Sequence, residues 1–438
     1  MLNKLCEGNG QMLISQNKEI DVKRSLCILL AIFMLTGALG MFGCEKDEQP
    51  VMDEPPEDLI DPEPDNEPED IPKPEEPTDD GLTKEELEAM QVKHDLENYN
   101  YIIGTQAFDP GYQFTDQSPL MELTDRIVAW GSNMIKFHAA DDNLVDEILE
   151  KHDFDYVFMW YYGSDPNFKD GLGVWESKMD YKTVYNYTKK LLTTYNGTGK
   201  TFYIGHWEGD WIYLDNLNTS QKEVSDTVTD GMIQWLNNRQ KAIDDAKRDT
   251  PHENVEVWNY VEVNRPSDAL NDSFDRVVNR VLPFTNVDYV SYSAYDTMDA
   301  SEKRVSEVID LIYKNLPEKD GVPGPRVFIG EVAQPAANCD FNDQRHCDVN
   351  LNILKKYLKC DVKFVLYWQM YCNEKLENGK SRGFWLVNSD GEETLLYQKT
   401  SELLADGKIY VRSFFDDQGR LPTHEEYRAF LLNHEIFD

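Results

Sequence analysis

The stretch Arg326-Val327-Phe328-Ile329-Gly330-Glu331-Val332 decides the fold class, because it is a short apolar run that carries one acidic side chain near its end. Runs of this length, rich in β-branched and aromatic residues, are typical of strands. Similar runs recur along the chain. The eight predicted strands span residues 101–107, 133–138, 156–162, 202–208, 255–263, 287–295, 326–332 and 364–371.

Helical patterns separate these strands, for example over residues 121–130, 181–192, 224–248, 302–316 and 350–358. Strands that alternate with helices predict an α/β protein with a parallel sheet. Eight such units over about 300 residues suit a (β/α)₈ barrel, also called a TIM barrel. A doubly wound open sheet is the alternative, but it usually has fewer strands, and no glycine-rich fingerprint follows the first run.

The charge of the chain is concentrated in one segment. The 438 residues carry a net charge of −38, and 40% are hydrophobic, which is too many for a wholly disordered protein. Residues 45–80 contain seventeen acids and two lysines, a net charge of −15, together with nine of the twenty prolines. This segment predicts a disordered, extended tether. The acidity of the chain also argues against nucleic acid as a partner.

The amino-terminal segment predicts export. Lys23 and Arg24 precede a nearly uninterrupted apolar run over 26–42, as in a secretory signal peptide. The residues Met41-Phe42-Gly43-Cys44 resemble the lipobox of bacterial lipoproteins, in which the cysteine is lipidated. We therefore expect a signal peptide over 1–43, a tether over 44–80 and a barrel over 81–438. The resemblance implies a protein anchored to the outer membrane through lipid on Cys44, on its periplasmic face or at the cell surface.

Polar and aromatic side chains gather at the predicted strand ends, where the active sites of barrels lie. Aromatic faces stack on the apolar faces of pyranose rings, and histidine bonds hydroxyls, so these residues suggest a carbohydrate ligand. The predicted substrate-binding residues are His138, Trp160, His206, Trp207, Tyr292, Tyr295 and Trp368.

Two glutamates at strand ends are the candidate catalytic pair. Glu208 ends the fourth predicted strand and Glu331 ends the seventh, so the barrel sets them across its mouth. Glycoside hydrolysis needs one carboxyl group that protonates the leaving oxygen and a second that attacks the anomeric carbon or activates water. Their pKa values must differ, so that one group is protonated and the other ionised.

These motifs resemble those of the large clan of retaining (β/α)₈ glycoside hydrolases. Ile329-Gly330-Glu331 is similar to the strand of that clan that carries the nucleophile, and Glu208 matches its acid/base. The stretch from Val290 to Asp296 resembles the strand that offers a tyrosine to the nucleophile, which implies this role for Tyr295. Val365-Leu366-Tyr367-Trp368 resembles the strand that places a tryptophan beneath the sugar.

Two positions stay open. Most clan members have asparagine directly before the acid/base, and some have histidine, whereas this chain has Trp207 there and His206 one residue earlier. Because neighbouring strand side chains alternate in direction, the sequence leaves open which of the two contacts substrate. Glu262 is the alternative acid, which applies if the strand count is shifted by one.

We expect a monomeric hydrolase without cofactor or catalytic metal that cleaves a poly- or oligosaccharide with retention. A non-catalytic glycan-binding lipoprotein on a degenerate barrel is the alternative function. In an exported protein cysteines can pair, and Cys339–Cys347 is the candidate disulfide, with Cys347–Cys372 as the second choice.

Overall fold

The computed structural model describes residue 89, residues 94–96, residue 100 and residues 102–139, 142–164, 166–270 and 273–437. The predicted signal peptide, lipidation site Cys44 and acidic tether lie outside these residues, so their prediction stays untested.

The described residues form a closed barrel of parallel strands in the order of the sequence, which confirms the predicted (β/α)₈ fold class. Each strand pairs with the next, and β8 returns to β1, with Thr105 opposite Tyr367. The strands are β1 (Ile103–Ala107), β2 (Met134–His138), β3 (Tyr156–Trp160), β4 (Thr201–Gly205), β5 (Glu256–Val263), β6 (Tyr289–Ser293), β7 (Val327–Val332) and β8 (Val365–Tyr367).

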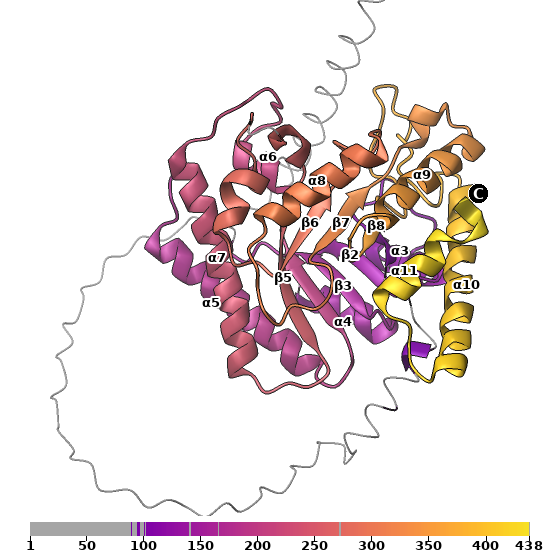
Figure 1. The fold of residues 1–438 in the computed structure, drawn as a ribbon, viewed down its shortest axis with the longest axis horizontal. Helices are drawn as coiled ribbons and strands as arrows, with labels where there is room; N and C mark the ends of the chain where they lie inside the picture. Colours follow the sequence, from indigo (N-terminus) through magenta and orange to yellow (C-terminus); the bar gives the residue numbers. More distant parts are fainter. Residues whose placement is uncertain are drawn as a thin grey trace, which may run out of the picture. The chain divides into compact units, whose positions relative to one another are not determined.

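Helices surround the strands on the outside (Figure 1). They are α3 (Pro119–Trp130), α4 (Asp142–Lys151), α5 (Val174–Thr194), α6 (Gly209–Leu214), α7 (Asp226–Asp249), α8 (Glu302–Asn315), α9 (Asp343–Leu358), α10 (Leu395–Gln418) and α11 (His424–Leu432). None of the helices in this described part of the chain combines the length and apolar character needed to cross a membrane.

Local signals in the sequence explain where several helices begin. Ser118, Ser225, Ser301 and Thr394 each accept a hydrogen bond from a backbone N–H of the first turn of the helix that follows. Such caps satisfy amides that have no partner within the helix. The helices therefore begin at fixed points, and these points set the lengths of the loops above the strands.

The two faces of each strand belong to different parts of the core. Inward side chains fill the lower barrel with aromatic rings, among them Phe158, Tyr203, Tyr260, Phe328 and Phe364. Outward side chains pack against the helices in a larger cluster. Because successive strand residues alternate between these faces, the position of a residue within its strand decides whether it can reach the barrel mouth.

Candidate active site

A β-bulge aims Glu331 into the barrel. On β7, Ile329 pairs with Tyr292, but the next pair is Ser293 with Glu331, so Gly330 is the extra residue. Ile329 and Val332 both pack outward in the helix-facing core. Without the bulge, alternation would turn Glu331 outward as well. Bulges commonly re-aim a side chain beside an active site.

The Glu331 carboxyl group is buried, with 5% of the residue exposed. The Tyr295 hydroxyl donates to its Oε1 at 2.9 Å, as the sequence predicted, while Oε2 has no hydrogen-bond partner. Burial raises the pKa of Glu331 to about 8, although the Lys136 ammonium and the Tyr295 hydroxyl both lower it. One oxygen of this carboxyl group is thus fixed and the other is available to a ligand.

Glu208 lies three residues after the end of β4, directly before α6, and has a backbone conformation that is rare for a residue with a side chain, with φ at 25°. Its backbone N–H donates to Glu262 Oε1 at 2.8 Å, and its Oε1 accepts from the Ser293 hydroxyl at 3.2 Å. Burial, together with the neighbouring carboxylates Glu331 and Glu262, raises the pKa of Glu208 well above its ordinary value.

Ser293 connects the two candidate catalytic groups. It lies opposite Glu331 in the β6–β7 pairing, and its hydroxyl donates to Glu208. The charge of Glu331 also raises the pKa of Glu208, so the two carboxyl groups titrate together. The two groups differ in their donors, because Glu331 accepts from the Tyr295 hydroxyl at 2.9 Å and Glu208 from the Ser293 hydroxyl at 3.2 Å.

Aromatic rings line the site around these carboxyl groups. Phe108, Trp160 and Trp368 form one cluster, with ring centroids 3.9 Å apart for Phe108 and Trp160 and 6.5 Å apart for the two tryptophans. Trp207 follows at 6.4 Å from Trp160. The indole N–H groups of Trp160 and Trp368 are buried without hydrogen-bond partners. Phe108 was not singled out from the sequence, because a phenylalanine after a strand carries no distinctive signal.

His138 lies at the end of β2, and its ring packs edge-on against Tyr162, with centroids 5.9 Å apart. Burial lowers its pKa, although Asp109 opposes this shift. The imidazole is therefore neutral near pH 7 and can both donate and accept a hydrogen bond.

Two predicted substrate contacts are wrong. His206 is fully buried, and its ring lies 5.3 Å from that of Trp235 on α7, so it points outward to the helices. The Tyr292 hydroxyl bonds Asp296 and Thr297 in the same outer layer. Tyr292 thus occupies an outward position of β6, and His206, the residue after β4, also points outward, which decides the open choice against His206.

Sequence reasoning missed a buried ion pair beneath the mouth. Lys136 of β2 and Glu262 of β5 are both completely buried, with Nζ 2.9 Å from Oε2. The sequence indicated Glu262 only as an alternative acid, and Lys136 was not predicted to be a functional residue. The available signal was a lysine at the centre of the apolar run Met134–His138, because lysine is rarely buried unless it is paired.

The predicted Cys339–Cys347 disulfide is not formed. Cys339, Cys347, Cys360 and Cys372 are all free thiols. Cys347 packs from α9 into the outer core, whereas Cys339 lies outside that cluster, at the end of a short 3₁₀ helix (Ala336–Cys339). The two sulfur atoms are thus held by different packing environments.

Possible metal ligands come together at the opposite end of the barrel. Within the described ranges, His94, Asp153 and Asp155 form one group of three such side chains. His94 Nε2 lies 2.8 Å from Asp153, and Lys200 Nζ donates to the same carboxylate. The histidine and the lysine therefore already supply positive charge there, and we interpret the group as an ion-pair network.

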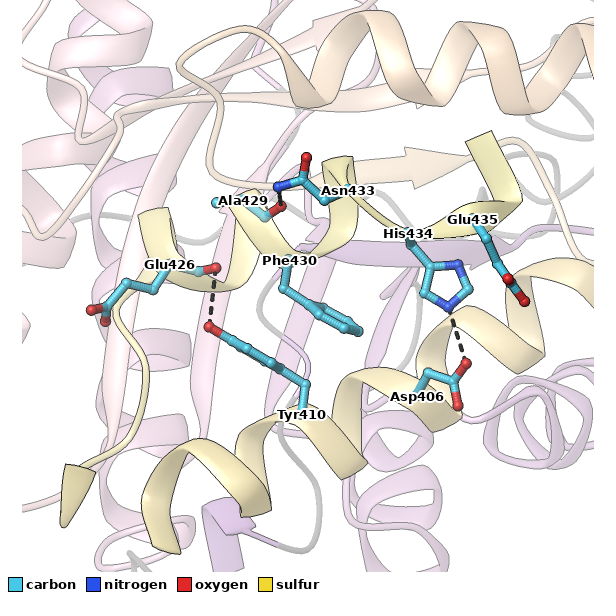
Figure 2. A pocket seen from close by; sticks show the side chains of 8 residues that line it. All are labelled: Asp406, Tyr410, Glu426, Ala429, Phe430, Asn433, His434 and Glu435. Carbon is cyan, nitrogen blue, oxygen red and sulfur yellow. Dashed lines mark hydrogen bonds and ion pairs between the residues drawn. The ribbon is translucent and has the colours of Figure 1, made fainter. Parts of the chain in front are cut away.

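A hollow of about 530 Å³ lies between α10 and α11, on the outside of the barrel (Figure 2). Its polar groups bond one another: His434 Nε2 lies 3.0 Å from Asp406, and the Tyr410 hydroxyl donates to the backbone of Glu426. The rings of Tyr410 and Phe430 stack with centroids 4.3 Å apart. Nothing in this lining provides a pair of coupled carboxyl groups.

Comparisons with known proteins give distant similarities. No protein-family model matches the chain, and no curated protein matches it. Solved structures similar to it include a GH39 enzyme from Xanthomonas axonopodis pv. citri, at 13% identity and a TM-score of 0.46, covering 70% of this chain and 67% of that one. A family 39 glycoside hydrolase from Bacteroides cellulosilyticus WH2 shares 11% identity with a TM-score of 0.47, covering 70% of this chain and 64% of that one. A GH39 β-xylosidase from Caulobacter crescentus shares 13% identity with a TM-score of 0.45, covering 70% and 72%.

Proposed function

We propose that this protein is a retaining glycoside hydrolase that cleaves a poly- or oligosaccharide. One observation carries the proposal: the carboxyl groups of Glu208 and Glu331 lie at the mouth of a (β/α)₈ barrel on either side of Ser293, which donates to Glu208 and is paired with Glu331, while Tyr295 donates to Glu331. Such a pair can hold one proton near neutral pH, which is the state that acid catalysis combined with nucleophilic attack requires.

Glu208 is the acid/base and Glu331 the nucleophile in this mechanism. Protonated Glu208 gives its proton to the leaving oxygen while a Glu331 oxygen attacks the anomeric carbon and forms a glycosyl-enzyme. Glu208 then takes a proton from water, which attacks the same carbon and releases Glu331. Tyr295 fixes one oxygen of Glu331, which leaves Oε2, the oxygen without a partner, for the attack.

The geometry favours Glu208 over Glu262 as the acid. Glu262 is completely buried, and both of its oxygens are occupied. Its Oε1 accepts from the backbone N–H of Glu208, and its Oε2 contacts Lys136 and Ser291. A carboxylate that is held in this way has no position from which to protonate a bound substrate. Glu208, by contrast, is partly exposed at the mouth.

The aromatic cluster supports a sugar as the ligand. Trp368 and Trp160 present ring surface beside the carboxyl groups, and their buried indole N–H groups have no acceptor within the protein. A buried donor without a partner is costly, so a hydroxyl of a ligand or a water molecule should satisfy it. Trp207 and His138 extend the same lining, with a neutral imidazole suited to hydroxyl groups.

The test begins with a screen of the full chain against plant, host and microbial glycans, with product stereochemistry followed by NMR. Glu331→Gln should abolish hydrolysis while the protein stays folded. Glu208→Gln, given an aryl glycoside whose leaving group needs no proton, should accumulate a glycosyl-enzyme that intact-mass measurement detects on Glu331. Glu425→Gln on the exposed side of α11 is the matched control and should behave as wild type.

The rival function is a glycan-binding protein that has lost turnover, and the unusual Trp207 before Glu208 is the feature that favours it. A wild-type protein that binds a glycan but releases no product would decide for this rival. Inverted products, or full activity in Glu331→Gln, would contradict the retaining mechanism.

We further propose that the protein is exported and held at the bacterial outer membrane by lipid on Cys44. The apolar run over 26–42 and the lipobox-like residues that end at Cys44 support this location. Replacement of Cys44 by alanine should release the protein from the membrane fraction. A protein that stays membrane-bound after this change would refute the anchor.

A further inference from the structure

The buried ion pair between Lys136 and Glu262 crosses the interior of the barrel. Lys136 comes from β2 and Glu262 from β5, which are not neighbours in the sheet, and neither side chain is exposed. The pair lies between the aromatic rings that fill the lower barrel and the mouth, where the two candidate catalytic residues are located.

Each member of the ion pair makes a hydrogen bond to the backbone at or directly before one candidate catalytic residue. Glu262 Oε1 accepts the N–H of Glu208 itself at 2.8 Å. Lys136 Nζ donates at 3.0 Å to the carbonyl of Gly330, the residue that precedes Glu331. Gln106 of β1 donates to the same carbonyl at 3.0 Å.

Stability alone does not account for this arrangement. Two buried ions lose their hydration, and apolar residues of similar size often stabilise a protein as well or better. Here the pair also accompanies a costly backbone conformation at Glu208, which the bond from Glu262 helps to maintain. Costly groups that persist at a strained residue indicate a functional role.

We infer that Lys136 and Glu262 are positioning residues that fix the separation of Glu208 and Glu331 and place one charge of each sign beside the two carboxyl groups. This inference rests on the proposed function for the roles of those carboxyl groups. Neither positioning residue contacts the substrate in this scheme, because both lie beneath the mouth.

The charges around the site make this role measurable. The charge of Glu262 raises the pKa values of both Glu208 and Glu331, whereas the charge of Lys136 lowers both. The other titratable groups close enough to act on these residues are Tyr295 and Glu374, which act on Glu331, and Tyr260 and the outward-pointing His206, which interact with Glu262.

Two uncharged variants of similar shape should move the pH profile of kcat/KM in opposite directions. Lys136→Met removes the cation, so both pKa values rise and the bell-shaped profile moves to higher pH. Glu262→Gln keeps an acceptor for the Glu208 N–H but removes the anion, so the profile moves to lower pH. A neighbouring charge commonly shifts a pKa by about one unit, and we expect each limb of the profile to move by about that amount.

The double variant Lys136→Met/Glu262→Gln separates positioning from stability. It buries no unpaired ion, so it should fold even where a single variant does not. Its profile should return close to that of the wild type, because the two opposing shifts cancel, while kcat stays reduced. A purely structural pair would lower the folded fraction without moving either limb, and that result would overturn the inference.

A measurement that needs no hydrolysis of a substrate keeps this test independent of the proposed function. The carboxyl carbons of Glu208 and Glu331 can be followed by NMR titration of ¹³C-labelled full-length protein and assigned with Glu208→Gln and Glu331→Gln. Opposite pKa shifts in the two single variants would support the inference even if no glycan is cleaved. Unchanged titrations would refute it, whereas absent hydrolysis alone would refute only the proposed function.

Discussion

Gly330→Ala should damage both folding and catalysis, because Gly330 has no room for a side chain. An added Cβ would lie 1.8 Å from Ser291 Oγ and 3.2 Å from Glu262 Oε2. To reach even 3.0 Å, the first pair of atoms must separate by 3.0 − 1.8 = 1.2 Å. Either the serine hydroxyl turns away, or the bulge on β7 moves.

Each response has an estimable cost. If the hydroxyl turns away, it loses its 2.7 Å bond to Glu262, and a hydrogen bond to a charged group contributes about 1.5–3 kcal/mol. If the bulge moves instead, Glu331 moves with it, and a misplacement of about 1 Å can cost about 100-fold in rate. We therefore expect a loss of about 1–3 kcal/mol in the free energy of unfolding, or a large loss of kcat/KM, or both.

Urea unfolding and initial rates on the best substrate measure these two quantities. The double variant Ser291→Ala/Gly330→Ala is the decisive comparison, since the next contact of the new Cβ is Ser291 Cβ at 3.1 Å, which is tight but tolerable. Its free energy of unfolding and its kcat/KM should be close to those of Ser291→Ala alone. A Gly330→Ala protein with wild-type stability and activity, or a double variant whose losses add, would refute this account.

Three further changes test other parts of the structure. Tyr295→Phe removes the hydroxyl that donates to Glu331, so the pKa of Glu331 rises and the acidic limb of the pH profile of kcat/KM moves to higher pH. The value of kcat/KM should fall about 10- to 100-fold, which corresponds to the loss of one hydrogen bond to a charged group. An acidic limb that does not move would contradict this. Ion-pair partners raise the pKa of His94 to about 10, so it stabilises the fold below its ordinary pKa of 6.5, and this contribution is lost as the pH rises towards 10. The difference in unfolding free energy between wild type and His94→Gln should thus be largest near pH 6 and vanish near pH 10; a constant difference would be inconsistent. Arg276→Met removes donors from one aspartate and three backbone carbonyls and should cost about 3–5 kcal/mol in urea unfolding, whereas Arg280→Met, on a more exposed side chain, should cost less than about 1 kcal/mol.

Much of the fold could be predicted from the sequence, because apolar strand runs and helical periods are local signals. All eight predicted strand ranges overlap a strand of the barrel, although β4 begins one residue earlier, at Thr201, and β8 ends earlier than expected, at Tyr367. The predicted hydrogen bond from Tyr295 to Glu331 is also present.

The orientation of individual side chains was harder to predict. His206 and Tyr292 were chosen for their chemistry, but each occupies an outward position, and the sequence does not fix which residue of an apolar run faces inward. Glu331 is the opposite case: strand alternation alone would turn its side chain outward, and only the bulge at Gly330 turns it to the mouth. Such an irregularity depends on the pairing of β6 with β7 and has no local signal.

The role of Glu262 could not be inferred for a different reason. Its partners Lys136, Ser291 and the Glu208 N–H come from three other segments, which only barrel closure brings together. A glutamate at a strand end looks the same in the sequence whether it protonates a ligand or holds another residue.

The buried ion pair also has a consequence for how the protein can be assembled. Lys136 belongs to the half of the barrel formed by β1–β4, and Glu262 to the half formed by β5–β8. A fragment that contains either half alone holds a solitary charge in a place that only the other half can neutralise. The two charges are therefore buried and paired only in the closed barrel, after the fifth strand has joined the first four.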